Sequence, residues 1–287
     1  MEDLLKVQAE PQNGIFNLLP ESLDVIKETE VKTYSHRAKD FNIEKCLFTE
    51  RPEFTNPLRA LGKDSNILEL AAGEAKHSLN LLKDGFNVAI SDIAPGAVQK
   101  VKAFTQQLNI NSKANFFVID AENLPFNDES FDGIFIIAAL HHLQDVKQAL
   151  AEIHRSLKPG GCFLIGYEPA SWQYYLFFPI TRTLRFLLRK KNKNRPTSLA
   201  DDIAKGFSRR KLKKLLKEVG FKRVEVTPVH YTYKTYKNYR ILVSKFTKKK
   251  YKESELMKKI FLKIDQYIAQ IPLLKDLAWD FDAKAYK

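Results

Sequence analysis

Residues 66–92 read NILELAAGEAKHSLNLLKDGFNVAISD, and this stretch decides the fold. It opens with an apolar run of strand length, residues 67–72, that ends in small side chains. A leucine-containing segment follows Gly73 and stops at Gly85, and a second apolar run then ends on Asp92. This order predicts a strand, a tight turn, a helix and a second strand, which together make one βαβ unit.

The turn and Asp92 are expected at the same edge of the sheet, because crossovers between parallel strands are right-handed. Small side chains at Ala71, Gly73 and Ala75 let a ligand approach the backbone and the first amide groups of the helix. Asp92 can accept hydrogen bonds from both hydroxyl groups of a ribose. The G-x-G-x-x-G spacing that cradles a pyrophosphate is absent, so the pattern favours a nucleoside ligand without one.

Length and composition indicate a globular protein. The chain has 287 residues, and 44% of them are hydrophobic, which is enough for one large domain or two small ones. Two cysteines and six scattered histidines fit neither a disulfide framework nor a metal site, so no metal is expected. The opening MEDLLKVQAE lacks the regions of a secretion signal, and no apolar run reaches the roughly 18 residues of a spanning helix. We therefore expect a cytoplasmic protein.

Charge divides the chain into two parts. Residues 1–181 carry 17 basic and 24 acidic side chains, whereas residues 182–287 carry 30 and 10, so the net charges are −7 and +20. A basic half of this size favours an anionic partner, which would be a membrane surface, a phosphorylated substrate or nucleic acid. In the first case the protein would be peripheral on the inner face of the membrane. Solvated lysines without such a partner are the alternative reading.

The rest of the chain extends the first βαβ unit. The elements predicted after residue 92 are a helix from Pro95 to Asn109, strands over 115–120 and 132–140, a helix capped by Asp145, and a fifth strand over 162–169. A helix that Ser208 caps and Gly220 stops precedes a sixth strand, and residues 279–287 predict a seventh at the sheet edge. The fold class is therefore α/β, with a doubly wound, mostly parallel seven-stranded sheet, helices on both faces and a basic helical cap.

Four parts are expected along the chain. Residues 1–60 form a leader and lid, in which 1–30 are loosely structured, 31–48 are helical and a short helix starts at Asn56-Pro57. The core follows over residues 61–170. The insert, 171–206, mixes aromatic side chains with arginines and suits either a membrane interface or a cover over the substrate pocket. Residues 207–287 complete the sheet and add a basic run, 245–252, before an amphipathic helix over 257–268.

Four motifs in order carry a resemblance to a known family. They are ELAAG at 69–73, SDIAPGAV at 91–98, DAENLPFNDESFD at 120–132 and ALHHLQDVKQALAEIHRSLKPGG at 139–161. Together they are similar to the class I S-adenosylmethionine-dependent methyltransferases, within the type 11-like group that has L-H-H and L-K-P-G-G signatures. The likeness is strongest over residues 31–168, and it implies a Rossmann-like fold and S-adenosyl-L-methionine as the cofactor.

The resemblance also implies a set of cofactor-binding residues. The set comprises Tyr34, Arg37, Glu69, Leu70, Ala71, Gly73, Asp92, Ile93, Asp120, Ala121 and Ala138. Residues 69–73 would flank the methionine part, Asp92 would hold the ribose, and Asp120 with its neighbour would contact the adenine. Tyr34 and Arg37, in a T-Y-x-x-R-A-x-x-F pattern, would close over the methionine end. The chain departs from the family's usual G-x-G-x-G at two positions, where it carries alanine.

Methyl transfer from a sulfonium requires alignment of the acceptor and, for some acceptors, removal of a proton. The candidate bases are His141 and His142 after the fourth strand and Glu168 at the end of the fifth. For the two histidines, shaping the floor of the site is the alternative. For Glu168 the alternative is to line the pocket.

Three functions stay open at this point. The first is methyl transfer to an oxygen, nitrogen or carbon atom of a small-molecule or lipid-linked acceptor. An anionic membrane surface is one place where this transfer would occur. The second is methylation of RNA, gripped by the basic lobe and its tyrosines, although no compact RNA-binding module accompanies the core. The third is a non-catalytic scaffold, which the alanines at positions 71 and 75 would permit.

Overall fold

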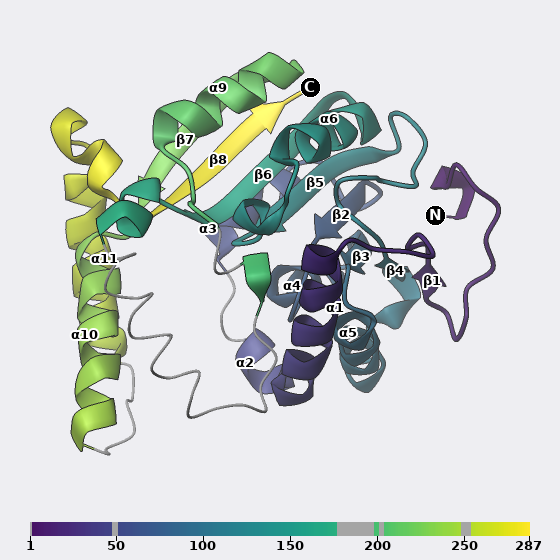
Figure 1. Cartoon of the computed structure of the whole chain (residues 1–287), viewed down its shortest axis with the longest axis horizontal. Helices are drawn as coiled ribbons and strands as arrows, with labels where there is room; N and C mark the ends of the chain where they lie inside the picture. The colour runs from purple at the N-terminus through teal and green to yellow at the C-terminus, as the bar shows by residue number, and fades with distance from the viewer. Residues whose placement is uncertain (1, 48–50, 177–197, 201–203, 248–253) are drawn as a thin grey trace.

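The computed structural model describes residues 2–47, 51–176, 198–200, 204–247 and 254–287 (Figure 1). Within these residues one mixed sheet has the spatial order β1-β4-β3-β2-β5-β6-β8-β7. Its strands are β1 Phe16–Asn17, β2 Asn66–Leu70, β3 Asn87–Asp92, β4 Ala114–Val118, β5 Phe131–Ile137, β6 Leu157–Pro169, β7 Lys222–Val229 and β8 Asp280–Tyr286.

Helices flank this sheet. The α-helices are α1 Val25–Arg37, α2 Ile43–Leu47, α3 Pro52–Arg59, α4 Lys76–Lys83, α5 Pro95–Gln107, α6 Val146–Ser156, α9 Arg209–Val219, α10 Thr232–Thr247 and α11 Glu255–Ile268. The short 3₁₀ helices are η1 Glu2–Leu4, η2 Ala38–Asp40, η3 Asn111–Lys113, η4 Leu140–His142 and η5 Pro272–Leu277. No helix among the described residues is both long enough and apolar enough to cross a membrane.

The strands from β2 to β6 pair in parallel, and β8 runs antiparallel to both of its neighbours. The chain moves outward from β2 through β3 to β4 and then returns to β5 on the other side of β2. In doubly wound sheets, ligands bind outside the carboxyl ends of the strands where this reversal occurs. The topology therefore marks the carboxyl ends of β2 and β5 as the place for a site.

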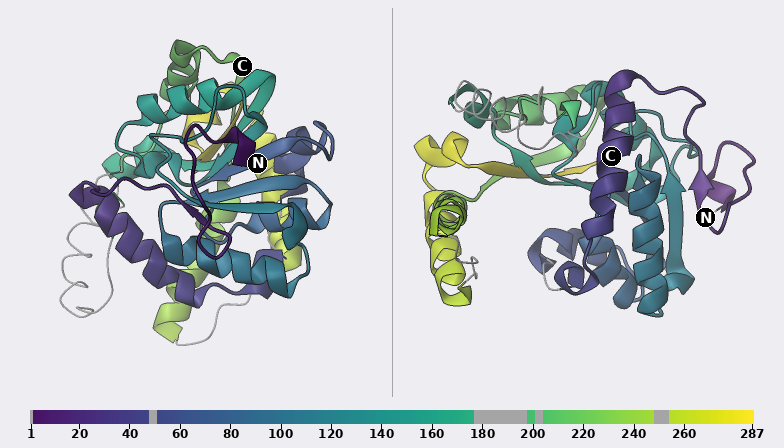
Figure 2. Two further views of the ribbon diagram at one scale, coloured as in Figure 1. Left: turned by 90° about the vertical axis from the view of Figure 1, so that its right-hand side faces the viewer. Right: turned by 60° about the horizontal axis from the view of Figure 1, so that its bottom comes forward.

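Alternating side chains of the strands feed an apolar cluster on each face of the sheet. On β5, Ile134 and Ile136 join the cluster that contains the apolar faces of α6 and α9. Phe135, which points the other way, joins the cluster that contains those of α4 and α5. Figure 2 shows the two helical layers on either side of the sheet. The predicted doubly wound α/β fold is thereby confirmed.

The leader differs from its prediction. Helix α1 begins at Val25, well inside the part predicted to be loose, because the Asp24 side chain accepts hydrogen bonds from the Ile26 and Lys27 amides. Upstream of it, β1 pairs with β4 and adds an eighth strand to the predicted seven. Phe16 anchors this strand, since it is buried and stacks on Phe117 with ring centroids 5.2 Å apart.

The last strand was also wrongly placed by the sequence pattern. Strand β8 lies between β6 and β7 and not at the edge of the sheet, which β7 occupies. Its side chains at Phe281, Ala283 and Ala285 are buried against the core, as a strand with two neighbours requires. The edge position suits β7, whose burial alternates with exposure along its length.

Two helices depart from the expected pattern, and two expectations fall on undescribed residues. Helix α3 begins at Pro52 and carries Pro57 inside it, and α10 was not predicted. Of the insert, residues 171–176 are helical, and 177–197 lie outside the described residues. Most of the basic run over 245–252 lies outside them as well. The helix predicted over 257–268 is confirmed as part of α11.

Candidate functional site

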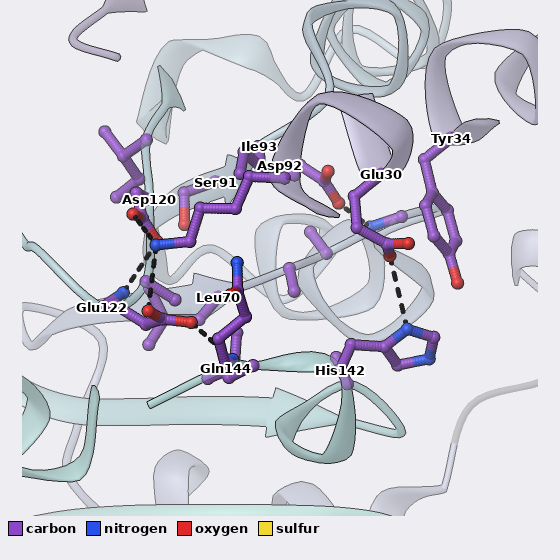
Figure 3. A pocket seen from close by; sticks show the side chains of 18 of the residues that line it. Glu30, Tyr34, Leu70, Ser91, Asp92, Ile93, Asp120, Glu122, His142 and Gln144 are labelled. Atoms are coloured by element: carbon purple, nitrogen blue, oxygen red, sulfur yellow. Dashed lines mark hydrogen bonds and ion pairs between the residues drawn. The ribbon is translucent and has the colours of Figure 1, made fainter. Parts of the chain in front are cut away.

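A cavity opens at the carboxyl ends of β2, β3 and β5, below α1 (Figure 3). About 960 Å³ between its walls is free of protein atoms, and this volume includes the open solvent at the mouth. Of the residues singled out in the sequence, those that line it are Tyr34, Leu70, Ala71, Gly73, Asp92, Ile93, Asp120, Ala121, Ala138 and His142. Arg37, Glu69, His141 and Glu168 do not line it.

The turn between β2 and α4 forms one wall. Ala71, Gly73 and Ala75 all adopt the left-handed conformation, with φ values of 49°, 51° and 50°. A side chain added at Gly73 would meet no atom within 4 Å, so the backbone there faces open space. The two alanines thus take the backbone conformation that glycine usually supplies, and the turn keeps its shape despite the departure from G-x-G-x-G.

Asp92 ties this turn to the tip of β3. Its carboxylate accepts hydrogen bonds from the Gly73 and Ala94 amides, each at 2.9 Å. Burial raises the pKa of Asp92, although these amide hydrogen bonds oppose the shift. Each oxygen accepts one bond from the backbone, which leaves further acceptor capacity for a ligand. The geometry therefore places the acid beside the bend, as the sequence predicted.

One end of the cavity is ionic. The Lys27 ammonium from α1 reaches Asp120 at 2.7 Å and Glu122 at 2.9 Å. Burial alone lowers the pKa of Lys27, but the hydrogen bonds and charges of the two carboxylates together raise it above its ordinary value. The other oxygen of Glu122 accepts the Gln144 amide at 2.7 Å. Asp120 is thus already engaged by the protein on the side that faces α1.

The other end of the cavity holds Glu30, Tyr34 and His142, at the opposite side of the close-up from Asp120 (Figure 3). Glu30 Oε2 lies 3.3 Å from His142 Nδ1. The ring of Tyr34 stands edge-on to the imidazole, with centroids 6.0 Å apart. Glu30 is a buried acid, whereas Tyr34 and His142 are half-buried, so a carboxylate, an imidazole and a phenol line this end of the cavity.

The remaining predicted residues support the site from behind. Glu168 is fully buried and accepts hydrogen bonds from the Ala139, Leu140 and His141 amides. It also lies 2.9 Å from His141 Nδ1. Its carboxylate therefore fixes the backbone that follows β5, which includes η4.

Glu69 and Arg37 are also outside the lining of the cavity. The Ser78 hydroxyl donates a hydrogen bond to the Glu69 carboxylate, and burial raises the pKa of Glu69 to about 8. The Arg37 guanidinium lies over the ring of Tyr34, 4.8 Å from its centroid. The first contact holds β2 against α4, and the second holds the ring of Tyr34 in place.

Lys27 and Glu30 both line the cavity, although the sequence pattern had not singled them out. Together with Tyr34 they are spaced by three and four residues, and this spacing places all three on one face of a helix. The signal was present in the sequence, but a helix start set at residue 31 concealed it. The Asp24 cap is the local mark that would have moved this start to Val25.

Comparisons with known proteins agree with this architecture. The family described as a methyltransferase domain matches residues 68–165. Among curated relatives, the ubiquinone/menaquinone biosynthesis C-methyltransferase UbiE of Rickettsia prowazekii is 29% identical over 192 residues, which cover 60% of this chain and 77% of the relative. UbiE of Rickettsia akari is 31% identical over 175 residues, with 56% and 70% covered.

Solved structures show the same fold. Phosphoethanolamine N-methyltransferase 2 of Haemonchus contortus, in complex with S-adenosyl-L-methionine, superposes with a TM-score of 0.54 at 16% identity, over 93% of this chain and 60% of that one. A putative sarcosine dimethylglycine methyltransferase from Galdieria sulphuraria also gives 0.54, at 17% identity over 92% and 97%.

Motifs, topology and relatives lead to one assignment. The protein is an enzyme that uses S-adenosyl-L-methionine as its cofactor. The residues of the cavity suit this cofactor, because an open backbone turn at Gly73 and the carboxylates of Asp92 and Asp120 border it. The chain belongs to the class I S-adenosylmethionine-dependent methyltransferases.

Proposed function

We propose that this enzyme methylates a carbon atom of a small, apolar or lipid-linked acceptor. The observation that carries the proposal is the buried contact between Glu30 and His142 at the end of the cavity away from Asp120. A methyl transfer to carbon needs a base, because the carbon that gains the methyl group must lose a proton. The relatives named UbiE are C-methyltransferases, which supports the same class of acceptor atom.

The cofactor would be held by the wall residues already described. When bound, S-adenosylmethionine supplies a methyl group that its sulfonium has already activated. The turn at residues 70–73 would admit the cofactor close to the backbone, and Asp92 would accept hydrogen bonds from the ribose hydroxyls. Asp120 and Ala121 would border the adenine. Ile93 and Ala138 would close the apolar sides of the cavity.

His142 would take the acceptor's proton on the imidazole nitrogen that does not face Glu30. The nearby Glu30 carboxylate would stabilise the resulting imidazolium and hold the ring in one orientation. Tyr34 would limit where the acceptor can lie, because its ring stands against that of His142. Glu168 and His141 would act as positioning residues, since their contacts fix the loop that carries His142.

The test supplies the enzyme with methyl-labelled S-adenosylmethionine and a cell extract divided into organic-soluble, aqueous and RNA fractions. Mass spectrometry should find the label in an organic-soluble small molecule, on a carbon atom. His142→Gln should lose this product, whereas His36→Gln, a change on the exposed side of α1, should keep it. Label in the RNA fraction, or on nitrogen or oxygen, would contradict the proposal.

A further inference from the structure

Helices α10 and α11 follow the carboxyl end of β7. The cofactor cavity opens at the carboxyl ends of other parallel strands of the same sheet. The end of β7, Val229, pairs with Asp280, and Asp280 also pairs with Pro169 at the end of β6. Helix α10 begins at Thr232, directly after this point. The two helices project from the sheet at the end of the molecule opposite the N-terminus (Figures 1 and 2).

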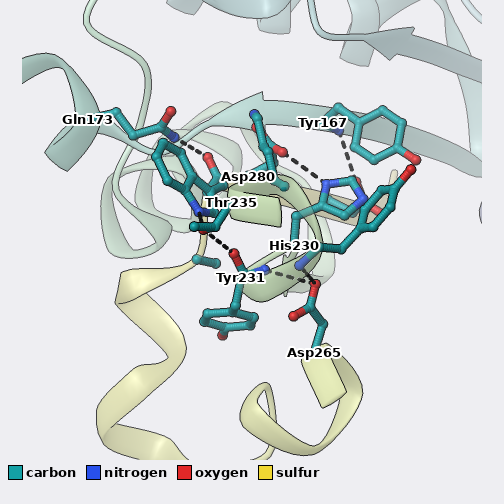
Figure 4. A network of polar contacts seen from close by, with 12 residues as sticks. Tyr167, Gln173, His230, Tyr231, Thr235, Asp265 and Asp280 are labelled. Atoms are coloured by element: carbon teal, nitrogen blue, oxygen red, sulfur yellow. Dashed lines mark hydrogen bonds and ion pairs between the residues drawn. The ribbon is translucent and has the colours of Figure 1, made fainter. Parts of the chain in front are cut away.

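The inner face of α11 is fixed against α10. Phe261 stacks on Tyr236 with ring centroids 4.7 Å apart. Asp265 accepts hydrogen bonds from the Tyr231 amide at 3.0 Å and from the amide and hydroxyl of Thr232 at 2.7 and 2.6 Å (Figure 4). These contacts set the rotation of α11 about its axis. Phe261 and Asp265 therefore face the protein, and the flank of α11 that carries Leu256 and Ile260 is left exposed.

This exposed flank, about a third of a turn from the inner face, is apolar. Leu256, Ile260, Ile264 and Tyr267 follow one another at helical spacings of four, four and three residues, and each is between 40 and 68% exposed. Ile271 extends the row beyond the helix with 46% exposure. We call these five residues the α11 stripe. Soluble proteins seldom expose neighbouring large apolar side chains in this way, and such patches usually mark a contact surface.

Basic side chains border the α11 stripe. Lys259 and Lys263 are exposed on the same helix, and their positions on the helical wheel lie beside Tyr267 and Leu256. Residues 182–287 as a whole carry a net charge of +20. An amphipathic helix with an apolar face and a lysine border fits the surface of an anionic bilayer, where it lies in the plane of the interface.

We propose that the α11 stripe docks this enzyme on the surface of an anionic phospholipid bilayer. The inference deepens the proposed function, because a lipid-linked or apolar acceptor would then reach the cavity at the same edge of the sheet. The apolar side chains would enter the boundary between headgroups and acyl chains. The lysines beside them would pair with lipid phosphates.

Vesicle flotation tests the docking. The full chain should float with phosphatidylcholine vesicles that contain phosphatidylglycerol, and much less with phosphatidylcholine alone. Ile260→Ser/Ile264→Ser should lower the partition coefficient about tenfold. The matched variant Val7→Ser/Val25→Ser alters two exposed apolar residues outside the stripe and should bind as the wild type does. Circular dichroism checks that both variants are folded.

Three results would overturn the docking: no flotation of the wild type at low salt, equal losses in both variants, or binding of single-stranded RNA that depends on the α11 stripe. Transfer assays in detergent separate the two proposals. If the enzyme methylates an organic-soluble acceptor in detergent but does not float with vesicles, only the docking proposal is refuted. If the protein floats but methylates no such molecule, the proposed function is refuted and the docking stands.

Discussion

Ala71 and Ala75 show what the backbone at the cofactor site requires. Both adopt positive φ angles, which cost an alanine roughly 1–2 kcal/mol relative to glycine. The fold bears this cost because Asp92 holds the adjacent Gly73 amide and β2 is paired on both sides. The alanines therefore preserve the turn, which removes the structural reason for reading the chain as a scaffold.

Asp92→Asn should weaken cofactor binding. The substitution keeps the size of the side chain but removes the charge that strengthens hydrogen bonds to ribose hydroxyls. Such bonds contribute roughly 1.5–3 kcal/mol, so the Kd measured by calorimetry should rise about tenfold to a hundredfold. Asp64→Asn, in an exposed turn, is the control and should leave the Kd unchanged. An unaltered Kd in Asp92→Asn would show that the ribose lies elsewhere.

Glu30→Gln should slow turnover without weakening cofactor binding. The amide cannot stabilise an imidazolium at His142, so kcat should fall roughly tenfold or more. Steady-state assays with the acceptor identified in extracts give kcat, and calorimetry should show the cofactor Kd within about twofold. Glu28→Gln, on the same helix and half exposed, serves as the control. A normal kcat in Glu30→Gln would show that Glu30 does not stabilise an imidazolium at His142.

At the scale of elements, α1 covers the cavity, and Lys27 attaches it to Asp120 and Glu122, which follow β4. Lys27→Met should leave Asp120 and Glu122 as neighbouring carboxylates with no ammonium between them. We expect α1 to open more readily by about 1–3 kcal/mol, which hydrogen exchange of the amides in residues 25–37 would report. Exchange in β2 should not change.

Lys32→Met provides the matched comparison for α1. Lys32 lies on the same helix, but its side chain is 70% exposed and its partner Glu28 is one turn away. Exposed pairs of this kind contribute only about 0.3–0.5 kcal/mol. Equal exchange rates in the two variants would mean that the ionic end of the cavity does not hold α1 closed.

The elements that sequence reasoning found are those with local signals. Caps at Asp145 and Ser208 and the stop at Gly220 were all confirmed, because each satisfies backbone groups within one turn. Helix α10 escaped prediction for the opposite reason. The amides at its start are satisfied by Asp265, which lies 33 residues further along the chain than Thr232. No local sequence pattern predicts a cap that a side chain of another helix supplies.

At the scale of the whole molecule, the sequence predicted the layers but not the strand order at the far end of the sheet. Apolar runs indicate that a segment is buried, and β8 is buried. They do not indicate which neighbours it pairs with, since the pairing of β8 with β6 joins residues more than a hundred positions apart. The cavity likewise combines parts that a local pattern predicts with parts that come from a distant segment. Its floor was found from the motifs, whereas Lys27 and Glu30 arrive from a helix that folds over it.

Global stability should depend on pH through Glu69. In the unfolded chain this acid loses its proton near its ordinary pKa of 4.5, whereas burial raises the pKa in the folded protein to about 8. Between these values the folded state binds more protons, so the free energy of unfolding falls as pH rises through this window and levels off above it. Glu69→Gln removes this dependence and can still accept the Ser78 hydrogen bond. Urea unfolding at about pH 5 and about pH 9 should show the wild type losing stability relative to the variant, on the order of a few kcal/mol. Glu225→Gln, exposed on β7, is the control and should show the same pH dependence of the free energy of unfolding as the wild type. Parallel pH profiles for Glu69→Gln and the wild type would mean that folding does not raise the pKa of Glu69.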